Sequence, residues 1–137
     1  MIGITVLLVV LVAATAFGIV YRSRAGKVRV SESAGSPELR ALLLAAGAPL
    51  DAPVVLHFSA DWCGPCAAVR RVVGQVLSDL EGPVDLELDI DANPELARAM
   101  NVMSLPTTFV LGAGLVERAR ISGVPKAEAL RSALVNP

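Results

Sequence analysis

The hydrophobic positions of this chain form two kinds of pattern, an unbroken apolar run at the start and a periodic pattern over the rest. Residues 1–21 contain no charged side chain and consist mainly of Leu, Val, Ile and Ala. A helix of about 20 residues is about 30 Å long, which matches the hydrocarbon thickness of a bilayer. The run therefore predicts a transmembrane helix over residues 2–21, within an anchor of residues 1–22, with Tyr21 at the membrane interface.

A cleaved signal peptide is the alternative interpretation of this run, because Ala14-Thr15-Ala16 weakly resembles a cleavage site. Signal peptides begin with a positively charged segment, whereas this chain has no Lys or Arg before position 22. The apolar run is also longer than a usual signal core. Both observations favour an anchor.

Beyond the anchor, short apolar strands alternate with amphipathic helices. Val54 to Phe58 has the pattern of a buried strand that begins after Pro53. The helix that follows has an apolar face formed by Val69, Val72, Val73, Val76, Leu77 and Leu80. The remaining predicted elements are helices that begin at Pro37, Pro94 and Pro125, and strands over residues 84–90, 106–111 and 115–121. This order predicts one α/β domain over residues 38–137, a central mixed sheet flanked by helices.

The segment 23–37 joins the anchor to this domain. Its glycines, its proline and its four serines are typical of a linker. The alternation of Val28-Arg29-Val30 leaves open a short additional strand within it.

Basic residues gather directly after the apolar run, at Arg22, Arg24, Lys27 and Arg29. The positive-inside rule places such a flank, and the domain behind it, on the cytoplasmic side of the membrane. An extracytoplasmic domain is the alternative.

The charge of the remaining chain argues against one class of partner. From Ser36 onward there are 12 acidic and 8 basic residues. A mildly acidic domain has no electrostatic basis for binding nucleic acid.

The candidate chemistry lies in Trp62-Cys63-Gly64-Pro65-Cys66, which holds both cysteines of the chain. The motif follows the predicted strand and opens the predicted helix, where unpaired N–H groups and the helix dipole stabilise a thiolate. Cys63 is therefore the candidate nucleophile, and Cys66, one turn further on, can close on it as a disulfide. A purely structural disulfide would close too short a loop to stabilise much. A zinc site needs four ligands, and the chain offers two cysteines and one histidine.

Together with its surroundings, this motif resembles the thioredoxin family. Four further segments resemble family elements in the same order: Leu88-Asp89-Ile90-Asp91 with Asn93-Pro94, the cis-proline loop Leu105-Pro106-Thr107, the turn Gly112-Ala113-Gly114, and Gly123. The likeness covers about residues 50–137. It implies a thioredoxin-like fold and protein-disulfide reductase activity in cell redox homeostasis. No cofactor is implied, because electrons would come from a reductase or another thiol protein.

The resemblance also implies which residues meet the substrate. Trp62 would cover the thiols, and Gly64-Pro65 is similar to the reducing subgroup of the family. A cis Pro106 would place the backbone of Leu105 beside the cysteines, where an extended substrate could pair with it. The implied substrates are protein disulfides.

His57 departs from the family pattern. It stands where a buried aspartate lies beneath the second cysteine, and Glu87 stands where a lysine pairs with that aspartate. The hypothesis is that His57, oriented by Glu87, accepts or relays the proton of Cys66. The alternative is an interior histidine without a role in the reaction.

These observations favour a membrane-tethered thiol–disulfide oxidoreductase that reduces protein disulfides through Cys63 and Cys66. Two alternatives stay open. One is an outward-facing thioredoxin-like reductase, for instance in cytochrome c assembly. The other is a non-catalytic membrane adaptor that binds partners at the Pro106 edge.

Overall fold

The computed structural model describes residues 2–24, 28–33 and 35–136. The helices are α1 (Ile2–Arg24), α2 (Pro37–Ala45), α3 (Cys66–Ser78), α4 (Pro94–Ala99) and α5 (Ala127–Val135). The strands are β1 (Val28–Ser33), β2 (Val54–Ser59), β3 (Val84–Asp89), β4 (Thr107–Leu111) and β5 (Glu117–Ser122). The predicted order of helices and strands in the domain is therefore confirmed.

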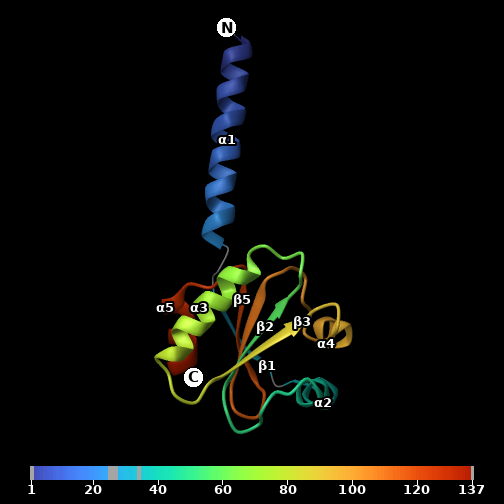
Figure 1. The fold of residues 1–137 in the computed structure, drawn as a ribbon. Helices are drawn as coiled ribbons and strands as arrows, with labels where there is room; N and C mark the ends of the chain where they lie inside the picture. The colour runs from blue at the N-terminus through green and yellow to red at the C-terminus, as the bar shows by residue number, and fades with distance from the viewer. Residues whose placement is uncertain (1, 25–27, 34, 137) are drawn as a thin grey trace.

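The strands form one mixed sheet in the order β1-β5-β4-β2-β3, in which only β2 and β3 run parallel. Helices α3 and α5 pack on one face, and α2 and α4 pack on the other (Figure 1). The predicted central mixed sheet flanked by helices is confirmed.

Strand β2 lies inside the sheet, and all six of its residues are buried. Its alternation divides the core, because side chains of a strand point to opposite faces in turn. Leu56 and Phe58 join the core under α2 and α4, and Val55 joins the core under α3 and α5. His57 and Ser59 share the face of Val55, so two polar side chains point toward the helix that begins at Cys66.

Strand β1 lies within the segment that was expected to be a linker, residues 23–37. It pairs antiparallel with β5, and Val28 lies opposite Ile121. The alternation at Val28-Arg29-Val30 is compatible with a strand. Its pairing covers an edge of β5 that would otherwise be open to solvent. The sheet thus includes residues of the segment 23–37, where the sequence had left a short additional strand open.

Helix α1 has no buried residue in its most apolar window. By length and composition its residues Ile2–Ser23 could cross a membrane, and a signal sequence would meet the same criteria. Its exposed apolar surface contrasts with α3, whose apolar face is covered by the sheet.

Candidate active site

The two cysteines stand at the junction between β2 and α3. The backbone N–H of Cys63 donates to the carbonyl oxygen of Ala60 at 3.0 Å, and that of Cys66 donates to the carbonyl oxygen of Cys63 at 3.4 Å. Pro65 immediately precedes the first helical residue, where its missing N–H leaves no helical bond unmade. Its carbonyl oxygen accepts from the N–H groups of Ala68 and Val69. The local sequence therefore builds a tight turn that opens directly into the helix.

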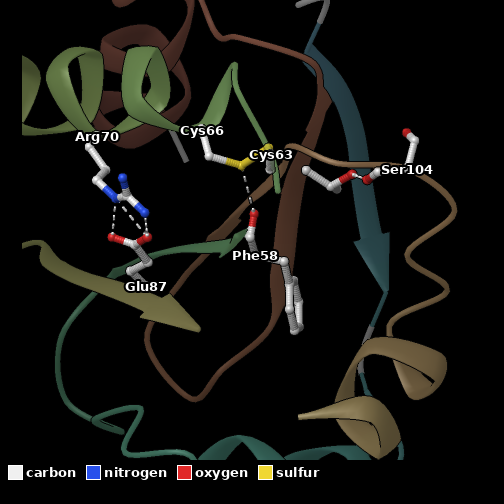
Figure 2. The surroundings of a disulfide bond; sticks show 7 residues. Phe58, Cys63, Cys66, Arg70, Glu87 and Ser104 are labelled. Atoms are coloured by element: carbon white, nitrogen blue, oxygen red, sulfur yellow. Dashed lines mark hydrogen bonds and ion pairs between the residues drawn. A yellow bond between two sulfur atoms is a disulfide. The ribbon is translucent and has the colours of Figure 1, made fainter. Parts of the chain in front are cut away.

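Cys63 and Cys66 form a disulfide, and the two sulfurs differ sharply in access. Cys63 is half-buried, whereas Cys66 is 1% exposed. The Cys66 sulfur lies 4.0 Å from the carbonyl oxygen of Phe58, at the end of β2 (Figure 2). A thiol or disulfide from another protein can therefore approach Cys63 and not Cys66.

The side chain of Trp62 is 71% exposed beside this disulfide. Its Nε1–H donates to Oδ2 of Asp91 at 3.4 Å, which ties the ring loosely to the loop after β3. Gly64 and Pro65 are exposed as well. The three residues form an open surface around the accessible sulfur.

The Leu105–Pro106 peptide bond is cis, as expected from the sequence. Thr107, the first residue of β4, lies opposite Phe58 in the sheet, so this loop and the disulfide occupy the same end of the sheet. The Pro106 carbonyl oxygen accepts from the N–H of Gly123, and the Thr107 hydroxyl donates to the carbonyl oxygen of Ser104. Bonds on both sides hold the loop in place.

His57 is 1% exposed, and its ring nitrogen Nε2 lies 2.9 Å from Oδ1 of Asp85. A carboxylate only accepts hydrogen bonds, so Nε2 carries a proton in this pair, and Nδ1 is the ring nitrogen that can accept a proton when the imidazole is neutral. The side chain of Asp85 is 46% exposed. A buried imidazole is thus joined to a carboxylate that reaches solvent.

The expectation that Glu87 orients His57 is wrong. His57 and Glu87 are neighbours in the β2–β3 ladder, but the Glu87 carboxylate binds Arg70 of α3, with Nε–oxygen distances of 2.8 and 2.9 Å (Figure 2). The permanent charge and the paired N–H groups of a guanidinium make it the stronger partner for a carboxylate. Asp85, two residues earlier on the same face of β3, is left for the imidazole.

The ion pair between Arg70 and Glu87 also shifts the pKa values of both groups. The hydrogen bond from Arg70 to the Glu87 carboxylate holds the pKa of Glu87 below its ordinary value. Ser59 and His57 lower this pKa further by smaller amounts, whereas partial burial raises it. The same bond raises the pKa of Arg70. The carboxylate therefore stays ionised further into the acidic range than a free glutamate, and it remains committed to Arg70.

Sequence reasoning missed Thr108, which lies opposite His57 in β4. Its hydroxyl oxygen is buried and, among the described residues, has no hydrogen-bond partner. The alternation around Phe109 would have placed Thr108 on the face of His57 once the pairing of β2 with β4 was known. Thr108 is thus a third polar side chain beneath α3, after His57 and Ser59.

A metal centre has no basis in the described part of the chain, where no three His, Cys, Asp or Glu side chains group together. Both sulfurs are committed to each other. The chemistry that the site offers is therefore that of the Cys63–Cys66 disulfide, one of whose sulfurs is accessible.

Comparison with known proteins points to one family. The thioredoxin family model matches residues 47–136. A thioredoxin from Chlorobaculum thiosulfatiphilum is 34% identical over 77 residues, which are 56% of this chain and 71% of that protein. A bifunctional thioredoxin reductase/thioredoxin from Mycobacterium leprae (strain TN) is 36% identical over 80 residues, which are 58% of this chain and 18% of that protein.

A solved structure extends the likeness to the fold. A mutant thioredoxin from Halobacterium salinarum NRC-1 is 28% identical, with a TM-score of 0.56 over 73% of this chain and 82% of its own.

Proposed function

The chain belongs to the thioredoxin family, and from that premise we propose that it is a membrane-tethered thiol–disulfide oxidoreductase that reduces protein disulfides. One observation carries the proposal: the disulfide joins an accessible Cys63 to a buried Cys66 at the start of a helix. Exchange needs one sulfur that meets the substrate and a second that is reserved for resolution.

In the proposed cycle the chain starts as the dithiol. The Cys63 thiolate attacks one sulfur of a substrate disulfide, so a mixed disulfide forms and the other substrate sulfur leaves as a thiolate that takes up a proton. The Cys66 thiol loses its proton and attacks the Cys63 sulfur. The Cys63–Cys66 bond forms and the second substrate thiolate leaves. The substrate gains two electrons, the chain loses two, and a thiol reductant or reductase restores the dithiol.

The substrate would be held by the open surface around Cys63. We assign contact roles to Trp62, Gly64 and Pro65, and to the backbone of Leu105 at Pro106, where an extended segment could pair by main-chain hydrogen bonds. The exposure of Trp62, Gly64 and Pro65 supports this assignment, and so does the position of the Pro106 loop at the same end of the sheet.

The resolving step needs a group that takes the proton of the buried Cys66 thiol. We propose that His57 does so through its other ring nitrogen, Nδ1, and that Asp85 stabilises the resulting imidazolium and connects it to solvent. The contact between the buried His57 ring and the half-exposed Asp85 carboxylate supports this role. The other charged groups near β2 on this face, Glu87 and Arg70, are paired with each other.

His57→Ala is expected to slow resolution on the order of a hundredfold near neutral pH and to change the pH dependence of its rate, because the thiol loses its base. Asp85→Asn should change the same profile in the same direction. The measurement is single-turnover thiol–disulfide exchange across pH. Glu87→Gln is the comparison variant on the same strand and should change the profile less than Asp85→Asn does, since the Glu87 carboxylate binds Arg70 and not the His57 ring. An unchanged profile for His57→Ala would remove the relay.

We further propose that α1 is a membrane anchor and that the domain lies on the cytoplasmic side. The apolar Ile2–Ser23 segment and the basic residues that follow it support this arrangement. In a cytoplasmic setting the dithiol state would be maintained, and the exchange would run toward reduction of the substrate.

A reporter fused after Pro137 is expected to be active only in the cytoplasm, and the chain is expected to stay with the membrane fraction after alkaline washing. A fusion that is active only outside would instead place the domain there, as an outward-facing reductase. Release of a shortened chain would identify α1 as a signal peptide.

Cys66→Ser is expected to accumulate mixed disulfides with its substrates, because the second step lacks its nucleophile. The full chain is expressed, thiols are blocked with acid and alkylating agent, and the adducts are separated under non-reducing conditions. The double variant Cys63→Ser/Cys66→Ser should trap nothing. Absence of adducts from Cys66→Ser would count against exchange and for a non-catalytic adaptor.

A further inference from the structure

We propose that the redox site faces the membrane and that its partner is an integral membrane protein with a cysteine pair at the membrane surface. This inference rests on the proposed function and on the anchor role of α1. It follows from where β1 joins the sheet and from how few residues separate it from α1.

The start of β1 lies at the redox end of the sheet. One row of paired residues crosses the sheet from Val28 through Ile121 and Thr108 to His57. Phe58, one residue further along β2, has its carbonyl oxygen beside the Cys66 sulfur. Because neighbouring strands are about 4.8 Å apart, Val28 lies only about 14 Å from His57, at the same end of the sheet.

The connection to α1 is short. Three residues separate Arg24, the last residue of α1, from Val28. Four Cα-to-Cα steps reach at most about 14 Å. A membrane-spanning α1, whose position relative to the sheet can be followed in Figure 1, would therefore hold the redox end of the domain near the membrane surface.

The inverted arrangement would stretch this tether to its limit. The six residues of β1 span about 17–20 Å along the strand. If the opposite end of the sheet rested on the membrane, Val28 would stand at least that far above it. With Tyr21 at the interface, residues 22–24 of α1 add about 4.5 Å, so the connection would reach Val28 only when it is fully extended. The domain can tilt, but turning its redox end away requires a fully stretched tether.

The surface of the redox end suits an apolar surrounding. Among the described residues of the domain, Met103 and Trp62 are the most exposed large apolar side chains, at 84% and 71%. Met103 lies in the loop that leads to β4, and Trp62 lies in the loop that leaves β2. Tryptophan is enriched at membrane interfaces, so the exposed Trp62 side chain suits a site that lies beside lipid and membrane protein.

The distance of the Cys63 sulfur from the membrane surface determines which cysteines it meets most often. A sulfur held this close to the membrane meets cysteines that lie just outside a transmembrane span more often than cysteines far from the surface. Confinement raises their effective concentration, and that advantage falls steeply as a tether lengthens. The partner class is therefore a membrane protein rather than a freely diffusing one.

The orientation is tested by the fluorescence of Trp62, the only tryptophan of the chain. The reduced full chain is reconstituted into phosphatidylcholine vesicles, with and without lipids that carry a nitroxide on the headgroup. Trp62 emission is expected to fall severalfold more than that of the double variant Trp62→Phe/Leu50→Trp. Leu50 is 41% exposed and bonds through its carbonyl oxygen to Gly114 of the β4–β5 turn, at the opposite end of the sheet. Equal quenching at both ends, or stronger quenching of the double variant, would overturn the orientation.

The partner class is tested by lengthening the tether. Twenty Gly/Ser residues are inserted after Gly26, and the pre-reduced chain is offered two probes in the same vesicles for a single turnover. One probe is a transmembrane peptide with a two-cysteine disulfide directly after its apolar span, and the other is a soluble peptide with the same disulfide. The insertion should slow reduction of the membrane probe on the order of tenfold and leave the soluble probe unchanged.

The outcomes separate the two proposals. If the insertion leaves the membrane probe unchanged, or slows both probes alike, the membrane partner is refuted while the exchange activity stands. If the original chain reduces neither probe, the proposed function fails and the partner fails with it. The quenching result decides the orientation in either case, because it needs no turnover.

Discussion

Replacing Cys63 by serine is expected to reduce insulin reduction to the rate seen without protein. Serine is not a nucleophile toward disulfides at neutral pH, because its hydroxyl has no accessible anionic form. Cys66 cannot take over the attack, since it is 1% exposed and lies under the helix that begins with it. The measurement is turbidity from precipitated insulin B chain with dithiothreitol as the electron source.

The matched control for this substitution is Ser104→Ala, which alters an exposed side chain in the loop before Pro106. It should retain the activity of the unaltered chain. Circular dichroism of both variants checks that the fold is kept. Insulin reduction that persists in Cys63→Ser, or that never occurs in the unaltered chain, would favour the adaptor over the enzyme.

Phe109→Ala is expected to cost about 3–5 kcal/mol of unfolding free energy, a large share of the roughly 5–15 kcal/mol of a typical domain. The Phe109 ring is fully buried in β4 and meets the ring of Phe58 edge-on at 6.1 Å. The Arg120 guanidinium covers its other side, 4.7 Å from the ring centre. Truncation leaves a cavity in the core between the sheet and helices α2 and α4.

Denaturant unfolding of the domain, followed by circular dichroism, measures this loss. Leu50→Ala removes a partly exposed apolar side chain outside the core and should change the unfolding free energy by about 0.5 kcal/mol or less. A Phe109→Ala chain as stable as Leu50→Ala would mean that the sheet core is not what holds the domain together.

The sequence alone determined the features that depend on neighbouring residues. The spacing of valines and leucines in residues 69–80 predicted α3, and its start at the cysteine pair predicted a reactive sulfur at a helix end. The charge-free run of residues 1–21 predicted a helix long enough to span a membrane. These patterns are local because helix periodicity and helix dipoles are properties of a continuous segment.

Only the tertiary structure decided which side chains from distant elements meet. Asp85 and Glu87 lie on the same face of β3, and nothing in the local sequence says which of them reaches His57. Arg70 of α3 binds the Glu87 carboxylate, which leaves Asp85 as the partner of His57. The position of β1 was decided in the same way, because β5 lies about 90 residues later in the chain and supplies the edge to which Val28 pairs. Register and partner choice are settled by several elements packing at once, whereas periodicity is written in each segment separately.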